Sequence, residues 1–481
     1  MTSTSFLRIC CTSHLRRAAG ETTFRNKTRN VESPKSSRNI MSEKWLAEDQ
    51  TIVLSWIHRE MINVHLTKEY INFKQFFPDV QSVDEEIRNF VNSGHKITEI
   101  QEAADLKPSI VELLEAMNKD IQVGQLLVKM FREQTHPHSL NTRDSLFLIN
   151  RCIRKSPRFV SKDSGEIPMP IVCILYYTMV TPSGLTAFAS QKINQLFQNI
   201  LIDYQRNFLV TEASLDILRV DDPPQGGWFS PQALEEIPDF DQTFVCDPSK
   251  PYKGFKSFDD FFTRRIRAGI RPIESPGDWR VITNACENAP FRISHQVAEK
   301  DSFWIKTQPY SLKDLLKDDT NLQRFVGGTI YQGLLTPHVY HRFHAPASGT
   351  IIRSDVIPGL CFSQITFDDQ KMDYPECQPY LAHVATRGVV LIDTKTPLGI
   401  VGFIAIGMTE VSSVELSIKT GDNVMKGQDI GAFHFGGSSH ILMFEKNVNV
   451  QFDLQGIQPD PVHGSEYLKV NTKIANFVGN L

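Results

Sequence analysis

The sequence lacks long hydrophobic runs. No apolar stretch reaches the ~20 residues that a helix needs to span a bilayer. The nearest approach, residues 171–180, is short and follows Pro168 and Pro170, so we expect a buried strand or core helix there. The sequence therefore predicts no transmembrane segment.

Paired cysteines are also missing. None of the eight cysteines forms a Cys-x-x-Cys pair or follows a regular spacing, and a chain of this size needs no disulfides to stabilise its core. This pattern is typical of a reducing compartment. We therefore expect a cytoplasmic protein without a bound metal.

Glycine and proline follow no period. The 27 Gly and 26 Pro residues are scattered along the chain, which excludes a collagen. With 41% apolar and 22% charged residues, the composition also excludes a coiled coil and a wholly disordered chain. At 481 residues, two domains or one large domain with an accessory region are expected.

The body of the chain has no excess of basic residues. The net charge is −4, of which residues 1–40 carry +6 and residues 41–481 carry −10. An acidic body argues against broad nucleic-acid binding, because that needs basic patches to displace counterions. The Arg-, Ser- and Thr-rich residues 1–45 are typical of either a disordered leader or a mitochondrial transit peptide. Mitochondrial localisation is therefore the alternative to the cytoplasm.

Helical patterns fill residues 46–220. Apolar residues recur at three- and four-residue intervals after residue 48, and residues 82–85 form a capping box. Pro108 opens another helix, and a further helix is expected over residues 186–200. This segment shows no catalytic constellation, so we predict a helical N-terminal domain whose large apolar residues form its core.

A Pro- and Gly-rich cluster at residues 221–227 predicts a domain boundary. Short β-rich runs follow it, separated by Gly, Pro and Asp, at residues 349–356, 389–392, 400–406 and 441–445. The fold class expected is α+β, with a helical N-terminal region and a β-rich catalytic domain over residues 221–481.

Aromatic residues and arginines alternate in residues 256–265, ahead of Arg271-Pro272. Phe258, Phe261 and Phe262 fall on one face of a predicted helix and the arginines fall on another. We expect a helix that is docked by its aromatic side chains and exposes its arginines.

Two histidines three residues apart, His341 and His344, lie in the run Tyr-His-Arg-Phe-His-Ala-Pro. On a strand these positions face opposite sides, and no neighbouring Cys or HExxH motif completes a zinc site. A paired acid/base role is the better functional interpretation. Core histidines without a catalytic role are the alternative.

A two-part pattern is similar to the hammerhead of biotinyl and lipoyl carrier domains. It consists of residues 345–351 (Ala-Pro-Ala-Ser-Gly-Thr-Ile) and residues 421–430 (Gly-Asp-Asn-Val-Met-Lys-Gly-Gln-Asp-Ile). A carrier domain presents a lysine at the hairpin tip that follows. Here residues 433–440 read Phe-His-Phe-Gly-Gly-Ser-Ser-His and the next lysine is Lys446, so the tip carries no biotinylated lysine.

The Gly-Gly-Ser-Ser run at this expected tip allows two interpretations. It is suited to a simple hairpin turn, because glycine adopts backbone conformations closed to other residues. A serine hydroxyl held against the preceding carbonyl can also attack it and convert the Gly437–Ser438 amide to an ester. β-Elimination then breaks the chain, and hydrolysis leaves a pyruvoyl group at the new N-terminus.

Three ordered motifs over about residues 250–481 resemble the pyruvoyl-dependent phosphatidylserine decarboxylase family. They are Phe-Phe-x-Arg with Arg-Pro, Tyr-His-Arg-x-His-x-Pro and the terminal Gly-Ser-Ser. The helical N-terminal region and the runs at residues 406–410 and 434–439 are more similar still to the fungal tryptophan decarboxylase branch of psilocybin biosynthesis. The hammerhead-like pattern would be part of this catalytic domain.

The resemblance implies roles for single residues. Ser438 is the processed residue, with Gly437 on the other side of the cleaved bond, so residues 1–437 and 438–481 would form a large and a small chain. His344 matches the base that deprotonates the Ser438 hydroxyl, and His341 matches the histidine assigned to decarboxylation. The pyruvoyl group made from Ser438 is the cofactor and an electron sink, and neither pyridoxal phosphate nor a metal is implied.

The acid that orients the base departs from the family's Ser-Pro-x-Asp-Gly pattern. Residues 281–288 align best and place Glu287 where the family has Asp. Residues 275–278 imitate the motif literally and offer Asp278, without a preceding strand. We favour Glu287, because a longer carboxylate can still orient a histidine.

These features predict a self-processing, pyruvoyl-dependent decarboxylase that converts an L-amino acid, aromatic and tryptophan-like, to its amine and CO2. The alternative substrate is phosphatidylserine, and a carrier or scaffold module is the non-enzymatic alternative. The expected partners are a small amino acid and the two chains of one precursor, with neither nucleic acid nor a transmembrane segment. A homodimer is left open, as is the substrate's side chain.

Overall fold

The computed structural model describes residues 50–65, 67–76, 101, 105–134, 140–161, 168–220, 226–300, 310–317, 319–364, 374–410, 412–460 and 466–480. Residues 42–481 form one compact unit. The expected leader and the capping box at residues 82–85 lie outside the described residues.

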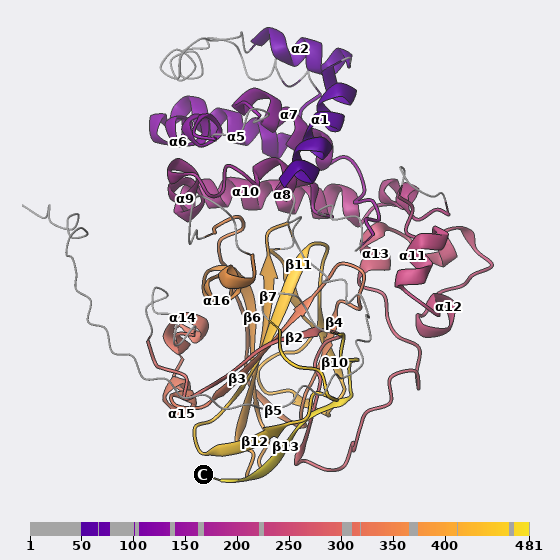
Figure 1. Ribbon diagram of the computed structural model, residues 1–481, viewed down its shortest axis with the longest axis vertical. Coiled ribbons are helices and arrows are strands. Elements are labelled where there is room, and N and C mark those ends of the chain that lie inside the picture. Colours follow the sequence, from indigo (N-terminus) through magenta and orange to yellow (C-terminus); the bar gives the residue numbers. More distant parts are fainter. Residues whose placement is uncertain are drawn as a thin grey trace, which may run out of the picture. The chain divides into compact units, whose positions relative to one another are not determined.

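Helices make up the N-terminal part of this unit (Figure 1). The periodicity after residue 48 is confirmed by α1, and Pro108 opens α5 as predicted, because proline fits the first turn of a helix. The stretch 171–180 begins as the buried helix α8. The helices are α1 (Gln50–His65), α2 (Lys68–Phe76), α5 (Pro108–Lys119), α6 (Ile121–Arg132), α7 (Thr142–Cys152), α8 (Pro170–Leu175), α9 (Pro182–Ala189) and α10 (Gln191–Tyr204).

The single helix expected over residues 186–200 is wrong, because the chain forms α9 and α10 there. The break falls at Ser190, whose backbone is extended (φ −72°, ψ 123°). Serine favours the position before a helix. Here the Ser190 carbonyl accepts the first α10 hydrogen bond, from the Asn194 N–H at 2.8 Å.

The aromatic segment forms short helices, α11 (Pro231–Glu236), α12 (Phe240–Thr243) and α13 (Phe258–Phe262). The predicted aromatic face of α13 is fully buried. The expectation of exposed arginines is wrong for Arg264, which is 2% exposed. Its guanidinium donates to the carbonyl oxygens of His338 (2.9 Å) and Val339 (3.2 Å) and lies 4.4 Å from the Phe244 ring centroid. The carbonyl oxygens and the ring face replace water around the buried charge.

A seven-stranded antiparallel sheet forms the centre of the C-terminal part (Figure 1). Its order is β2 (Ala289–His295), β3 (Thr329–Leu335), β11 (Gly437–Phe444), β7 (Ile400–Met408), β6 (Thr386–Asp393), β5 (Gly349–Ile357) and β9 (Asn423–Val424). The four predicted β-rich runs are confirmed as β5, β6, β7 and β11. With the helices above, they confirm the α+β class.

Two three-stranded sheets and three further α-helices also belong to the C-terminal part. One sheet has the order β1 (Val281–Thr283), β13 (Lys473–Asn480), β12 (Val448–Phe452). The other, called the small site sheet below, has the order β4 (Arg342–His344), β10 (Asp429–Phe433), β8 (Val414–Leu416). The helices are α14 (Leu312–Leu316), α15 (Leu322–Phe325) and α16 (Tyr374–Val384).

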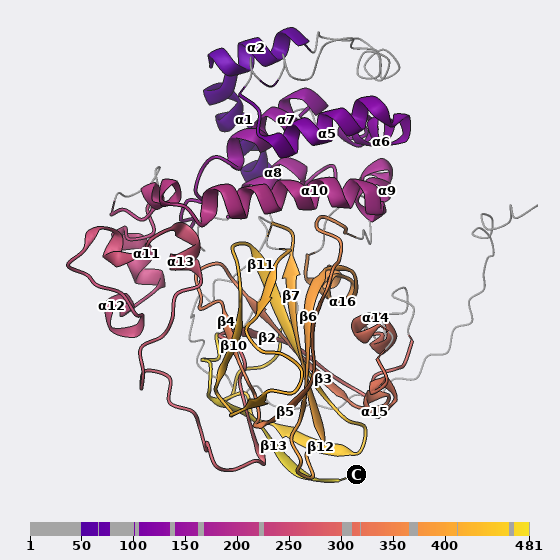
Figure 2. The ribbon, with the colours of Figure 1, turned by 180° about the vertical axis from the view of Figure 1, so that it is seen from behind.

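The central strand β11 is covered on both faces, which explains its continuous apolar sequence. Ile441 and Met443 belong to a core cluster that continues into the helices, whereas Leu442 and Phe444 belong to a second cluster. That second cluster includes Phe343 of the small site sheet. In both views the helices α8 to α10 lie beyond the same end of β6, β7 and β11 (Figures 1 and 2).

Candidate active site

The Gly437–Ser438 bond lies at the start of the central strand, and the expected hairpin tip is wrong. β10 belongs to the small site sheet and β11 to the seven-stranded sheet, so the two strands are not paired with each other. The chain crosses between the sheets at residues 434–436, where Gly436 has φ 136°, a value that favours glycine. In the ladders Ser438 is paired with Leu335 of β3 and Gly407 of β7.

Ser438 is fully buried, and its Oγ has no hydrogen-bond partner among the described residues. Side chains alternate along a strand, so Ser438 shares its face of β11 with Leu442 and Phe444, the face covered by the small site sheet. An unpaired buried hydroxyl costs about 1–3 kcal/mol. The fold therefore keeps a reactive group unpaired beside the Gly437 carbonyl.

His341 is fully buried next to the turn that precedes Ser438. The centroid of its ring lies 4.1 Å from the ring centroid of Phe262. The Phe262 ring also packs on Phe435, with 5.5 Å between the ring centroids. Nδ1 is 2.9 Å from the Val339 carbonyl oxygen, which only accepts, so Nδ1 carries the proton and Nε2 presents a lone pair. Nε2 has no partner among the described residues. Burial, followed by the charge of Arg264, lowers the pKa of His341 to about 3, which keeps the ring neutral.

His344 has both ring nitrogens engaged. Nδ1 donates to the Gly427 carbonyl oxygen at 2.7 Å, so the neutral ring accepts at Nε2 from the Tyr340 hydroxyl at 2.8 Å. Burial lowers the pKa of His344. His344 is thus neutral and could act as a base through the lone pair on Nε2, which accepts the hydrogen bond from the Tyr340 hydroxyl.

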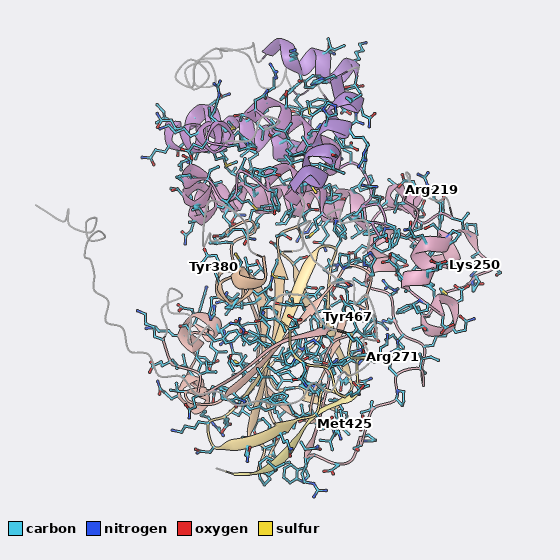
Figure 3. The ribbon with its side chains drawn as sticks, in the orientation of Figure 1. Arg219, Lys250, Arg271, Tyr380, Met425 and Tyr467 are labelled. Carbon is cyan, nitrogen blue, oxygen red and sulfur yellow. The ribbon has the colours of Figure 1, made fainter. Side chains whose placement is uncertain are left out.

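Glu287 is 4% exposed. Its carboxylate forms an ion pair with Arg271 Nε at 2.6 Å and a second, longer one with Lys469 Nζ at 3.8 Å. Arg271 is labelled in Figure 3. The strand that carries His344 runs beside the Glu287 segment, because the His344 N–H donates to the Ala285 carbonyl oxygen at 2.8 Å. Glu287 therefore influences His344 through its charge, which favours the protonated ring.

Asp278 lies in a turn at the surface. Both of its carboxylate oxygens bind Arg280, at 2.9 and 2.8 Å, and these hydrogen bonds lower the pKa of Asp278 to about 2. Lys426 Nζ donates to the Asp278 backbone oxygen at 2.7 Å. The structure thus gives Asp278 a role in the turn and brings Glu287 to the histidine strand.

Sequence reasoning missed a carboxylate–histidine pair close to the processing bond. His434 Nδ1 lies 2.8 Å from Asp259 Oδ1 and Nε2 lies 3.3 Å from Glu415 Oε2. Burial acts to lower the pKa of His434, but the hydrogen bond and charge of Asp259 outweigh it and raise the pKa. A ring that donates from both nitrogens holds its proton, so His434 is a poor base. No sequence signal joins residues 175 positions apart.

The described part of the chain contains neither a metal-binding cluster nor a membrane-spanning helix. No group of three or more His, Cys, Asp and Glu side chains in that part of the chain is arranged to hold a metal ion. Among the described helices, none has the length and apolar character needed to cross a membrane.

Known proteins match this chain over most of its length. The model of the phosphatidylserine decarboxylase family matches residues 258–469, and a second phosphatidylserine decarboxylase model matches residues 95–237. The decarboxylase iboD of Amanita muscaria is 36% identical over 355 residues, which cover 68% of this chain and 99% of that protein. The chain belongs to the phosphatidylserine decarboxylase family. The resemblance seen in its motifs is confirmed, and the chain is a carboxy-lyase.

Other family members extend the comparison. The L-tryptophan decarboxylase of Psilocybe cubensis is 32% identical over 393 residues, covering 77% of this chain and 86% of that protein. The phosphatidylserine decarboxylase proenzyme 2 of Oryza sativa subsp. japonica is 34% identical over 229 residues, covering 47% of this chain and 35% of that protein. The Amanita and Psilocybe proteins are thus similar to this chain over part of the helical region as well.

Proposed function

We propose that this chain is a self-processing, pyruvoyl-dependent decarboxylase that converts an aromatic L-amino acid, tryptophan-like, to its amine and CO2. The observation that carries the proposal is Ser438 itself. Its hydroxyl is fully buried at the start of a central strand, directly after Gly437 and the turn at Gly436, and none of the described residues hydrogen-bonds to it.

The hydrogen bonds of the two motif histidines fit self-processing. Attack by Oγ on the Gly437 carbonyl carbon requires the hydroxyl proton to move to a base. His344 is our proposed base, because its proton on Nδ1 leaves Nε2 as acceptor, and Glu287 stabilises the protonated ring through its charge. His341 is neutral, and its Nε2 has no hydrogen-bond partner in the described part of the chain, so we propose that it contacts the substrate carboxylate or transfers the proton during turnover.

A pyruvoyl group fits this site, because it would be made from the unpaired Ser438 and needs no further binding residue. When present, it supplies the electron sink for loss of CO2. Ser438 is fully buried, and the ring of Phe262 packs on Phe435 in the turn that precedes it. Such enclosure excludes water from the reacting carbon. Processing would leave a 44-residue small chain, residues 438–481.

The substrate class rests on the relatives. Two Psilocybe proteins named L-tryptophan decarboxylase are each 32% identical to this chain and cover 77% and 68% of it. Relatives named phosphatidylserine decarboxylase proenzyme cover 47% and 46% of it. We therefore propose a free amino acid as substrate, with phosphatidylserine as the alternative.

The hammerhead-like part is also a proposal. Its support is that the two halves of the pattern lie side by side: Gly349 is paired with Val424, and Thr350 with Asn423. Around Ala345, the backbone exchanges hydrogen bonds with Gln428 and Gly427, both at 2.8 Å. We infer that the catalytic domain keeps the carrier-like arrangement without the carrier lysine.

One experiment tests the function. Purified protein is incubated separately with L-tryptophan, other L-amino acids and phosphatidylserine, and CO2 release is measured beside a denaturing gel. We expect two chains on the gel and release from tryptophan. Release from phosphatidylserine alone would support the alternative. An uncleaved wild-type chain that decarboxylates at full rate would refute the pyruvoyl mechanism.

A further inference from the structure

Helix α13 contacts the crossing segment, residues 434–436, which leads from the small site sheet into the processing bond. The ring of Phe435 packs on Phe258 and Phe262 of this helix, with 5.5 Å between the ring centroids in each pair. Phe258 and Phe262 are themselves fully buried. The middle of the crossing segment is therefore fixed against a helix that lies inside the core.

His434, the first residue of the crossing segment, has a carboxylate at both ring nitrogens. Nδ1 lies 2.8 Å from Asp259 Oδ1 on α13, and Nε2 lies 3.3 Å from Glu415 Oε2 on β8. The side chain of Asp259 is 12% exposed and that of Glu415 is 63% exposed, so water screens the second ion pair more than the first. Asp259 is therefore the main partner, and it lies on the same helix as the aromatic contacts.

The charge of the His434 ring decides whether both contacts are made, because both nitrogens donate only when the ring is protonated. Among the described residues, Asp259 and Glu415 are the charged groups that face the ring. Burial acts to lower the pKa of His434, but the hydrogen bond and charge of Asp259, followed by the charge of Glu415, outweigh it and raise the pKa. A neutral ring keeps a single N–H donor, so deprotonation removes one of the two hydrogen bonds.

Helix α13 is in turn fixed to the rest of the site. The Phe258 N–H donates to Ser214 Oγ at 2.8 Å. Beyond the other end of the helix, the Arg264 guanidinium donates to the Val339 carbonyl oxygen at 3.2 Å, and the same oxygen accepts from His341 Nδ1 at 2.9 Å. A residue bound to α13 is therefore held in register with the segment that carries His341.

The backbone between His434 and the processing bond has few restraints of its own. Gly436 has φ 136°, and glycine adopts this conformation as readily as many others. Gly437 is paired with Met408 of β7, whereas the ladder with β3 starts one residue later, at Ser438. The position of the Gly437 carbonyl carbon thus depends on how the crossing segment is anchored upstream.

We propose that His434 is a positioning residue for self-cleavage. Its contacts with the carboxylates of α13 and β8 hold the crossing segment so that the Gly437 carbonyl carbon lies within reach of Ser438 Oγ. The inference rests on the proposed self-processing and adds a residue to it. In that step the Oγ–C bond forms, the C–N bond of the amide breaks, and the Oγ proton passes through the base to the Ser438 nitrogen. His434 keeps its own proton throughout.

The test is the pH profile of self-cleavage, followed as loss of full-length precursor. Burial lowers the pKa of His344, the proposed base, so this ring is already neutral at about pH 7 and above. A fall in rate at higher pH then reports the loss of the His434 charge. For the wild type we expect a fall of roughly 10- to 100-fold, the effect of one hydrogen bond between charged groups. His434→Gln keeps an N–H donor but has no charge to lose, so it should cleave at the slow rate at every pH.

Replacing the carboxylates should move this fall in rate. Asp259→Asn removes the main cause of the raised pKa, so the fall should occur at lower pH. Glu415→Gln, at a largely exposed side chain, should move it in the same direction by a smaller amount. Asp260→Asn is the matched control, because Asp260 is the exposed neighbour of Asp259 on α13, and it should keep the wild-type profile.

A second group that titrates in this range is Glu410, a buried carboxylate that accepts the Val172 N–H at the start of α8. Burial raises the pKa of Glu410 to about 8. The substitutions at Asp259 and Glu415 leave Glu410 in place. A fall in rate that moves with these substitutions therefore belongs to His434.

Urea unfolding of each substitution in an uncleaved Ser438→Ala background shows whether it folds. If Asp259 only stabilises the fold, Asp259→Asn slows cleavage by one factor at every pH and the fall stays where it was. That result overturns the inference while self-processing stands, as would identical profiles for wild type, Asp259→Asn and Glu415→Gln. A wild-type chain that never cleaves would refute the proposed self-processing and, with it, this role of His434.

Discussion

Replacing Tyr340 with phenylalanine tests which histidine takes the Ser438 proton. The Tyr340 hydroxyl occupies His344 Nε2 at 2.8 Å, so a base at His344 must first give up that hydrogen bond. A hydrogen bond of this kind contributes about 0.5–1.5 kcal/mol, which corresponds to roughly a 2- to 12-fold effect on rate. If His344 is the base, Tyr340→Phe should therefore accelerate self-cleavage by about that factor.

The assay follows the loss of full-length precursor after rapid translation, with the bands resolved on a denaturing gel. His344→Ala should accumulate precursor, because loss of a general base costs about 10²- to 10⁴-fold. His341→Ala should still cleave at least in part and turn over substrate poorly. The reasoning is refuted if Tyr340→Phe leaves the rate unchanged and His341→Ala, rather than His344→Ala, remains uncleaved. That result would mean that the two roles are exchanged.

Four further predictions concern Ser438, the two candidate acids, Glu410 and the leader. The Ser438→Ala variant should remain uncleaved and inactive. Mass spectrometry of the wild type should show a small chain with a blocked N-terminus. Glu287→Gln should slow self-cleavage by orders of magnitude, and Asp278→Asn should cleave like wild type. If a denaturing gel shows that Asp278→Asn blocks cleavage while Glu287→Gln does not, Asp278 is the acid. Burial raises the pKa of Glu410 to about 8, so its protonated form stabilises the fold, and this contribution to stability is lost as pH rises from about 4.5 to 8. Urea unfolding of the uncleaved Ser438→Ala protein should therefore show resistance to urea falling over this pH range. Adding Glu410→Gln should reduce that fall. Residues 1–45 fused to a fluorescent protein should remain in the cytoplasm, and import into mitochondria on fractionation would contradict this.

The regular elements were largely predictable, because their signals are local. The apolar runs of β5, β6, β7 and β11 and the periodicity of α1 depend on residues only a few positions apart. The break at Ser190 was missed because the apolar period continues through it. The assumed hairpin at residues 433–440 was wrong for another reason, since the chain there leaves one sheet and enters another.

The candidate site was predictable only in part. Ser438, His341 and His344 could be proposed because each lies within a short motif, and their roles stay predictions. The burial of Arg264 could not be seen, because its partners are carbonyl oxygens 74 and 75 residues away. No local pattern in a sequence reports such contacts.

The sequence by itself determined the α+β class, the family motifs and the choice of Gly437–Ser438 as the proposed cleavage bond, since each depends on neighbouring residues. Only the tertiary structure decided which groups are left unpaired or held charged. It buried Ser438 on the second-cluster face of β11, paired His434 with Asp259 across 175 residues, and placed Glu410 at the start of α8, with one carboxylate oxygen that has no partner among the described residues. Burial and long-range contacts set these properties, and both arise only when distant segments pack against each other.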